Sequence, residues 1–418
     1  MIIYVYFDNE MLQNPKLMGR LDCQMVRGKE LFTFEYDVEW LADKRFRQFD
    51  PDLQLFGGRQ YQPAGKSNFG IFLDSTPDRW GRVLLDRRES ARAHSESRVI
   101  QPLREWDYLL GVYDGGRMGA LRFKLNEDGP FLDNDGSMAS PPWTSLRELE
   151  YASMQLELDE NIANDRWLRM LLQPGSSLGG ARPKANVIDK NGALWIAKFP
   201  SRQDRKDVGA WEMVCMSLAD KCGIEVSASQ CERLGNADAR NYHTFLTKRF
   251  DRSSEGKRRH FTSAMTLLGY RDGTSEVDGV SYLELAEWIM SNCYDTQRDM
   301  EQLFRRIVFN MAVSNCDDHL RNHGFLYSAK GWSLSPAYDL TPDELGRGLR
   351  LNVNENDNAL DFDLALEIAP YLGIKNAKDI IEQIKKVVRK WHFEASRYGI
   401  PQEEQQRVAS AFSLCDGN

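Results

Sequence analysis

The sequence lacks two features that would assign it to a simple class: an excess of positive charge and a long apolar run. Its 62 acidic side chains outnumber 54 basic ones, which leaves a net charge of −8. A protein that binds nucleic acid by itself normally has a basic balance, so we do not expect a free-standing nucleic-acid binder. No apolar run approaches the roughly 20 residues of a membrane-spanning helix, so we expect no membrane contact.

Cysteine is also sparse. The seven cysteines are an odd number, widely scattered, with no C-x-x-C pair and no histidine spacing of a zinc site. This pattern favours reduced thiols in a cytoplasm. Residues 1–7 are apolar but end at Asp8 and carry no basic segment, so we expect a strand there rather than a secretory signal. The sequence therefore predicts a cytoplasmic protein.

The chain of 418 residues, 42% apolar, is long enough for two or three globular units. A turn-rich stretch at 126–142 marks a boundary, and an Asn-Gly pair at 191–192 between apolar runs predicts a hairpin. Strands are expected at 2–7, 31–36, 119–123, 185–188, 193–199 and 245–249, and helices at 145–158, 162–172, 210–221, 301–313, 359–372 and 377–398. The predicted order is a strand-rich part followed by a helix-rich part.

Residues 175–184, Gly-Ser-Ser-Leu-Gly-Gly-Ala-Arg-Pro-Lys, form a candidate phosphate loop between a predicted helix and the hairpin. Glycines let backbone N–H groups approach phosphate oxygens, and Arg182 and Lys184 add positive charge. The loop matches neither of the common nucleotide-binding patterns, so a helix cap followed by a tight turn is the alternative.

Lys198 lies on an apolar predicted strand one hairpin after this loop. It occupies the place of the strand lysine that contacts ATP phosphates in kinases, and Glu212 on the next helix could orient it. An exposed strand lysine and a solvated helix carboxylate are the alternatives.

Asp317 and Asn322 stand five residues apart in the pattern D-x-H-x-x-N, between a predicted helix and a predicted strand. In kinase catalytic loops the Asp accepts the hydroxyl proton and the Asn binds magnesium. A polar turn in which the Asp and Asn cap backbone groups is the alternative. His319 is expected to orient the loop through a backbone bond. Asp339, seventeen residues after Asn322, is a candidate second magnesium ligand, and a turn residue is its alternative.

These motifs together resemble those of the HipA kinases, the serine/threonine kinase toxins of bacterial type II toxin–antitoxin systems. The resemblance covers nearly the whole chain and implies an α+β, two-lobed protein-kinase-like fold with an additional amino-terminal α+β domain. The implied divisions are 1–143 for the extra domain, 144–255 for the first kinase lobe and 256–418 for the helical second lobe. The motifs are Ser177-Leu-Gly-Gly-Ala-Arg-Pro-Lys184, Ile196-Ala-Lys-Phe-Pro200, Arg249-Phe-Asp-Arg252, Asp317-Asp-His-Leu-Arg-Asn322 and Pro336-Ala-Tyr-Asp339, with Pro77-Asp-Arg-Trp-Gly81 and Gly119-Ala-Leu-Arg-Phe123 in the first domain.

The resemblance implies ATP and Mg²⁺ as cofactors, Asp317 as the catalytic residue, and Asn322 with Asp339 as metal ligands. Residues 248–250 would be the adenine hinge, although Lys248 departs from the acidic residue of many members. Ser177, with Ser176 as its neighbour, would be autophosphorylated, which would place negative charge where ATP phosphates must bind. The implied ATP-binding set is Ser177, Gly179, Gly180, Ala181, Lys184, Lys198, Lys248, Phe250, Asp251 and His319.

The implied partners are a protein substrate, for which aminoacyl-tRNA synthetases are family precedents, and a HipB-type helix-turn-helix antitoxin that would supply contact with operator DNA. Such toxins are associated with bacterial persistence. Two other readings stay open: a lipid or small-molecule kinase with the same D-x-H-x-x-N loop, and a catalytically silent co-repressor.

Overall fold

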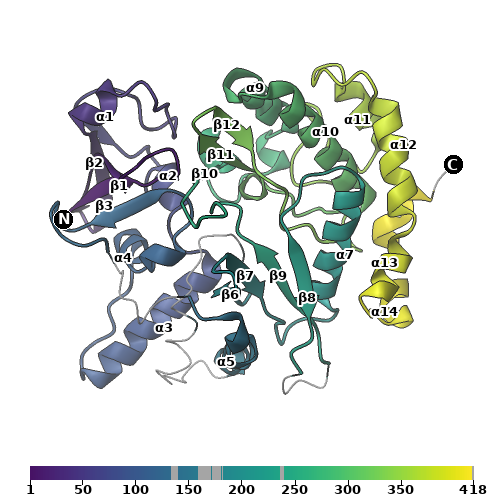
Figure 1. Ribbon diagram of the computed structural model, residues 1–418, viewed down its shortest axis with the longest axis horizontal. Helices are drawn as coiled ribbons and strands as arrows, with labels where there is room; N and C mark the ends of the chain where they lie inside the picture. Colours follow the sequence, from purple (N-terminus) through teal and green to yellow (C-terminus); the bar gives the residue numbers. More distant parts are fainter. Residues whose placement is uncertain (133–139, 159–170, 172–179, 181, 236–239, 417–418) are drawn as a thin grey trace. The chain divides into compact units, whose positions relative to one another are not determined.

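The computed structural model describes residues 1–132, 140–158, 171, 180, 182–235 and 240–416 (Figure 1). Two compact units share the chain. The first holds Met1–Arg202, Leu234–Asn241 and Lys248–Thr262, and the second holds Gln203–Arg233, Tyr242–Thr247 and Ser263–Asn418. Both helices and strands are present, which confirms the predicted α+β class. The boundaries predicted at 143 and 255 stay predictions.

The amino-terminal sheet of the first unit has the strand order β4-β3-β2-β1-β5, with antiparallel neighbours. Ile3, Val5 and Phe7 on β1 are fully buried, while the residues between them are only partly covered, as a pleated strand requires. Phe7 stacks on Phe49 at 5.1 Å beneath this face. The strands are β1 (Ile2–Phe7), β2 (Lys16–Val26), β3 (Lys29–Tyr36), β4 (Arg59–Tyr61) and β5 (Leu121–Lys124).

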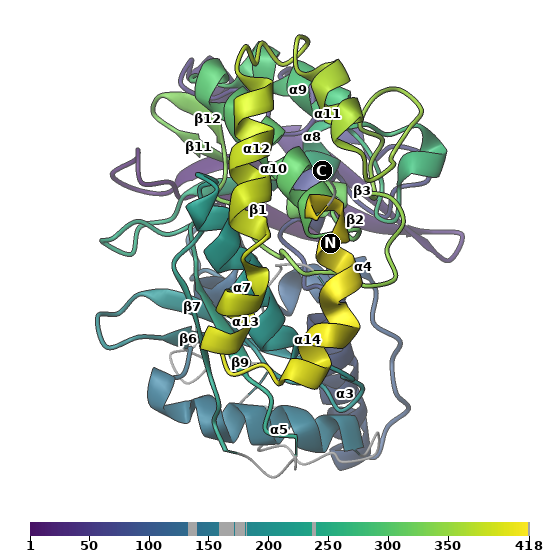
Figure 2. The same ribbon diagram turned by 90° about the vertical axis from the view of Figure 1, so that its right-hand side faces the viewer.

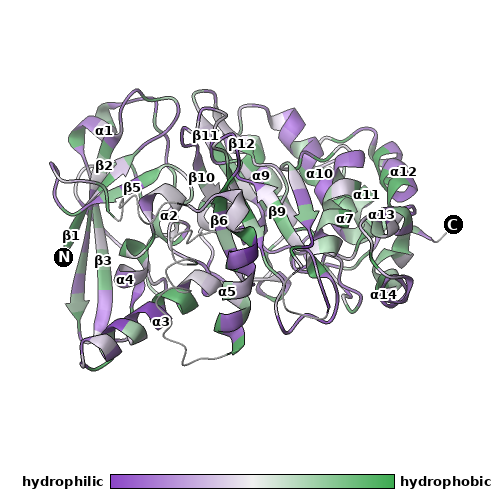
Figure 3. Cartoon of the chain, turned by 60° about the horizontal axis from the view of Figure 1, so that its bottom comes forward, coloured by the Kyte–Doolittle hydropathy of each residue, from purple (hydrophilic) through white to green (hydrophobic). Residues whose placement is uncertain are grey.

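The longest described helix of the first unit, α3, was not predicted. It begins after Asp78, whose carboxylate accepts the Gly81 N–H at 2.8 Å, and it buries Trp80 and Leu84. Hydrophilic and hydrophobic patches alternate along α3 and α5 in Figure 3, as expected of helices with one buried face. The helices are α1 (Val38–Ala42), α2 (Gly70–Leu73), α3 (Arg79–Ser95), α4 (Glu105–Leu110) and α5 (Leu146–Leu158).

The predicted Asn-Gly hairpin is confirmed as β6 (Lys184–Ile188) and β7 (Leu194–Lys198), which pair antiparallel. Asp189 begins the turn, and its side chain accepts the N–H groups of Asn191 and Ala193 at 2.8 and 2.9 Å. Gly192 has φ +80°, a backbone conformation that favours glycine. Lys184 and Lys198 face each other in the register of this hairpin.

The second unit is built around α10, where Leu303, Ile307 and Met311 are fully buried. Helices α9 and α12 pack against it, and Figure 2 shows α12 beside α10. The helices are α7 (Val208–Lys221), α8 (Ala264–Leu267), α9 (Tyr282–Asn292), α10 (Thr296–Ala312), α11 (Phe362–Ile368), α12 (Ala377–Val388), α13 (Trp391–Arg397) and α14 (Gln402–Val408). The strands are β8 (Ser229–Glu232), β9 (Thr244–Lys248), β10 (His260–Ser263), β11 (Gly324–Ser328) and β12 (Gly331–Leu334), of which β9 and β10 contain residues of both units.

Two helix predictions were too long. The predicted helix at 359–372 is confined to α11, because the Asp361 side chain caps it at one end by accepting the Asp363 N–H. The predicted helix at 377–398 is broken between α12 and α13, where Trp391 stacks on Phe412 at 4.5 Å with an interplanar angle of 9°. Most of the helix predicted at 162–172 lies outside the described residues. Within the described ranges, no helix combines the length and hydropathy that crossing a bilayer requires.

Candidate active site

The D-x-H-x-x-N loop follows α10 in the second unit and is held by Asp318. This buried carboxylate accepts hydrogen bonds from Tyr282 Oη at 2.6 Å, His323 Nε2 at 2.9 Å and Asn310 Nδ2. Burial by itself would raise the pKa of Asp318, but the His323 ring and the hydrogen bonds outweigh it, so the pKa lies below its usual value. The sequence analysis did not predict this anchor.

Asp317, next to the anchor, is exposed. The Asn322 side chain closes the loop, because its Nδ2 donates to the Asp317 carbonyl at 3.0 Å. The backbone N–H of His319 donates to the same carbonyl at 2.9 Å. The structure therefore brings together the Asp and Asn that the five-residue spacing predicted, and it leaves the Asn322 Oδ1 as the end of the amide that could ligate a cation.

Asp339 reaches the same site from the segment after β12. Tyr338 Oη in this segment donates to the Arg321 carbonyl at 2.7 Å, and the Asp343 N–H donates to the Ser314 carbonyl at 3.1 Å. Asp339 has φ +60°, a left-handed conformation that costs a non-glycine residue energy and often occurs at functional sites.

The negative charge of Asp339 contributes to a raised pKa of Asp317. The pKa of the Asp317 carboxyl is raised, first because surrounding protein desolvates it and also because Asp339 and Asp318 place negative charge nearby. The charges of His319 and Arg350 act in the opposite direction. Two carboxylates close enough to disfavour each other's ionisation form a site that a cation would stabilise.

The donor set fits magnesium bound together with phosphate. In the part of the chain that the structure describes, no group of three or more His, Cys, Asp or Glu side chains could hold a metal alone. Asn322 and Asp339 offer one amide and one carboxylate, and Mg²⁺ commonly takes few protein oxygens and completes its shell with water and phosphate. His319 Nδ1 is buried and has no hydrogen-bond partner among the described residues, so the expected bond from this ring atom to the backbone is not observed.

The predicted phosphate-binding residues belong mainly to the first unit. Lys184 is buried and forms an ion pair with Asp78 at 3.0 Å, while Trp80 Nε1 donates to the Lys184 carbonyl at 3.1 Å. The Pro-Asp-Arg-Trp-Gly motif of α3 thus holds the strand that begins at Lys184, a role that the sequence analysis missed. Lys198 on β7 is 9% exposed, and Gly180 has φ +103°.

The remaining residues predicted to contact ATP phosphates have no described position from which their contacts could be judged. Ser176, Ser177, Gly179 and Ala181 lie outside the described residues. Glu212 is buried on α7 in the second unit, whereas Lys198 belongs to the first, so their pairing stays a prediction.

The predicted hinge segment is tied into the first unit by Asp251. Asp251 is fully buried and pairs with Arg249 and Arg252, both at 2.6 Å, and it accepts the Gly119 N–H at 2.9 Å. These contacts assign the Arg-Phe-Asp-Arg motif a structural role that the sequence analysis missed, and contact of Asp251 with nucleotide stays a prediction. Phe250 packs on Phe261 at 5.8 Å.

The sequence is similar to those of known proteins. A family model described as "HipA-like C-terminal domain" matches residues 176–391. A "Putative kinase" of Haemophilus influenzae is 26% identical over 181 residues, which are 40% of this chain and 52% of that protein. The serine/threonine-protein kinase toxin HipA of Shewanella oneidensis is 24% identical over 267 residues, 56% of this chain and 59% of that protein. The chain thus spans only about half to three fifths of the length of these two relatives.

A solved structure shows the same fold. HipA in the complex of HipA, HipB and operator DNA from Shewanella oneidensis superposes with a TM-score of 0.64 at 17% identity, covering 98% of this chain and 96% of that one. This likeness confirms the predicted HipA-like fold. Because the family model matches more than half of its residues, the chain belongs to the family of proteins with a HipA-like C-terminal domain.

Proposed function

We propose that this protein is an ATP- and magnesium-dependent serine/threonine protein kinase that acts as a HipA-type toxin. The observation that carries the proposal is the convergence of Asp317, Asn322 and Asp339 within the second unit, with Asp339 close enough to raise the pKa of Asp317. Kinase relatives and the HipA fold support the same activity.

In this proposal Asp317 accepts a hydrogen bond from the serine or threonine hydroxyl and orients it toward the γ-phosphate. Asn322 and Asp339 hold magnesium, which neutralises charge on the phosphates. Asp318 keeps the loop that carries Asp317 in place, because its carboxylate accepts hydrogen bonds from three side chains. Lys198 and the glycine-bearing loop contact ATP phosphates, and Ser177 or Ser176 is the autophosphorylated residue.

Partners and location belong to the same proposal. The HipA relative of known structure is bound to HipB and operator DNA, so we propose a HipB-type antitoxin as the partner of this chain. Its net charge of −8 favours DNA contact through the antitoxin. All seven cysteines are free, which supports a cytoplasmic location. An aminoacyl-tRNA synthetase is the proposed class of substrate.

The test is phosphoryl transfer from labelled ATP to proteins of a bacterial lysate by the purified full chain. Asp317→Ala should lower the rate roughly 100- to 10,000-fold, as expected for loss of a catalytic acid or base. Asp363→Ala, which removes an exposed carboxylate of α11, is the matched control and should leave the rate unchanged. Label found only in lipids or small molecules, or toxicity that survives in Asp317→Ala, would refute the protein-kinase proposal.

A further inference from the structure

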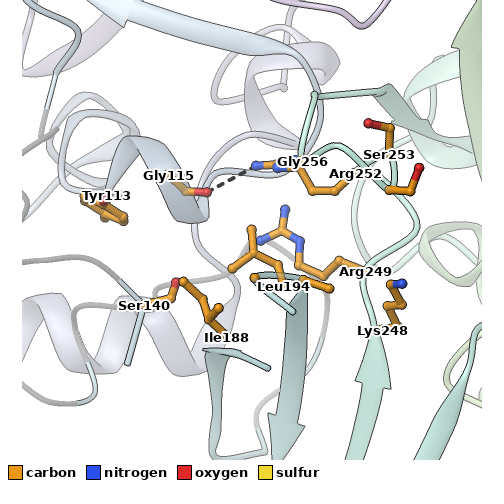
Figure 4. Close-up of a pocket in the computed structure, with 13 residues that line it drawn as sticks. Tyr113, Gly115, Ser140, Ile188, Leu194, Lys248, Arg249, Arg252, Ser253 and Gly256 are labelled. Atoms are coloured by element: carbon orange, nitrogen blue, oxygen red, sulfur yellow. Dashed lines mark hydrogen bonds between the residues drawn. The ribbon is translucent and has the colours of Figure 1, made fainter. Parts of the chain in front are cut away.

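A pocket of about 230 Å³ in the first unit shares Lys248 and Arg249 with the predicted hinge segment, but Asp317, Asn322 and Asp339 do not line it. Its lining residues are Tyr113 and Gly115, Ser140, Ile188 and 192–194, and 248, 249, 252–254 and 256 (Figure 4). These segments are far apart in the sequence, and all of them belong to the first unit.

One wall of the pocket is basic. Lys248, Arg249 and Arg252 line it, and none of the lining residues carries a carboxylate. Arg249 and Arg252 both pair with Asp251, and the charge of Asp114 also acts on Arg252. Arg249 is fully buried and acts through its charge, whereas Lys248 is partly exposed and can contact a ligand directly.

Arg252 lies on this wall, and its guanidinium is already hydrogen-bonded within the first unit. Its Nη2 donates to the carbonyls of Gly115 at 3.2 Å, drawn as a dashed line in Figure 4, and Arg117 at 2.9 Å. The pKa of Arg252 lies well below its usual value because burial disfavours the cation, and the charges of Arg258 and Arg249 add to this effect. An anion in the pocket would offset that cost.

Asp189, whose pKa is affected by the charge of Lys248, accepts hydrogen bonds from its own hairpin. The charge of Lys248 lowers the pKa of Asp189, although burial works against this shift. Asp189 accepts two backbone N–H groups of its own turn and the Trp195 indole N–H at 3.0 Å. It therefore serves the hairpin and lies outside the lining of the pocket.

The rest of the pocket combines hydroxyl groups with an apolar wall. Ser253 Oγ accepts the N–H groups of Glu255 and Lys257 at 3.2 and 3.1 Å, so its hydroxyl proton can be donated to a ligand. Ile188 and Leu194 provide apolar surface from the hairpin. The volume is below the roughly 300 Å³ at which pockets for larger organic ligands begin.

We propose that this pocket binds a small phosphate monoester, with the phosphate against Lys248, in the positive field of Arg249 and Arg252, and a compact apolar group against Ile188 and Leu194. A charge-assisted bond from Lys248 and the positive charges of the two arginines suit a phosphate dianion, and the apolar wall distinguishes an ester from inorganic phosphate.

The experiment is isothermal titration of the full chain with phenyl phosphate and with inorganic phosphate, in chloride buffer at constant ionic strength. Phenyl phosphate should bind more tightly than inorganic phosphate. Lys248→Gln should raise the Kd for phenyl phosphate about tenfold, because one charge-assisted contact is lost. Lys257→Gln removes an exposed cation of the same turn that does not line the pocket, and it should leave the Kd unchanged.

A second variant keeps the test decisive if Lys248→Gln folds poorly. Ser254 is exposed at the rim, and Ser254→Asp should weaken binding by adding a negative charge without disturbing the core. Absence of binding at millimolar phenyl phosphate, or equal weakening in Lys257→Gln, would overturn the proposal. Complete displacement by ATP would also overturn it, because the phosphate would then occupy the nucleotide site.

Discussion

Replacing the two adjacent aspartates of the D-x-H-x-x-N loop one at a time should separate the anchoring role of Asp318 from the proposed catalytic role of Asp317. Asp318→Ala removes an acceptor that serves Tyr282, Asn310 and His323, all through the same oxygen. Each orphaned buried donor costs about 1–3 kcal/mol, and breaking a buried charged network typically costs about 3–5 kcal/mol. Asp317→Ala removes an exposed carboxylate from the same loop and should change stability by only about 0.5 kcal/mol.

The assay is thermal unfolding of the full chain combined with phosphoryl transfer. For a unit of this size about 3–5 kcal/mol corresponds to a fall in melting temperature on the order of 10 °C, which is expected for Asp318→Ala and not for Asp317→Ala. Both variants should lose activity, but only Asp318→Ala should lose it together with stability. Equal melting temperatures for the two variants would refute the anchor role of Asp318.

The stability that Asp318 contributes should depend on pH. The folded-state pKa of Asp318 lies below its usual value, so its contribution to stability is present above about pH 4 and is lost as the pH falls further. The stability difference between the wild type and Asp318→Ala should therefore shrink in acid. A difference that stays constant down to about pH 2 would contradict the ionised state of Asp318.

Three further outcomes are expected. Asp251→Ala should destabilise the first unit by about 3–5 kcal/mol in urea unfolding, because Arg249 and Arg252 lose their shared buried partner, and an unchanged midpoint would contradict this. Arg350→Gln should move the acid limb of the pH–rate profile to higher pH, because the Arg350 charge lowers the pKa of Asp317, and a shift to lower pH would show that this electrostatic assignment is wrong. Chelation with EDTA should abolish phosphoryl transfer, and added Mg²⁺ should restore it; activity that persists in EDTA would exclude a magnesium-dependent reaction.

Local patterns predicted the elements whose signals are contained within a few residues. The Asn-Gly turn produced the β6–β7 hairpin, because Gly192 tolerates the positive φ and Asp189 caps the turn. The five-residue spacing of Asp317 and Asn322 is the length that lets the Asn322 amide reach the Asp317 carbonyl. Helix α10 was recognised from its apolar periodicity, although it begins five residues earlier than predicted.

The errors arose where a distant partner decides the local structure. Apolar periodicity continues past residue 388, but the chain turns there and Trp391 stacks on Phe412. The burial of Lys184 depends on Asp78, more than one hundred residues earlier, which no local pattern reveals. The same is true of Asp251, whose backbone donor is Gly119.

The sequence alone indicated the family and the α+β class, and it predicted the residues of the D-x-H-x-x-N loop, because these depend on residue types at short spacings. The tertiary structure decided which of two neighbouring aspartates is exposed and which is buried, and it placed Asp339 beside Asp317. It also showed that Asp251 and its two arginines form a buried ion-pair network. The physical reason is that burial and counter-charges come from residues distant in the chain, and these set whether a carboxylate supports the fold or faces a ligand.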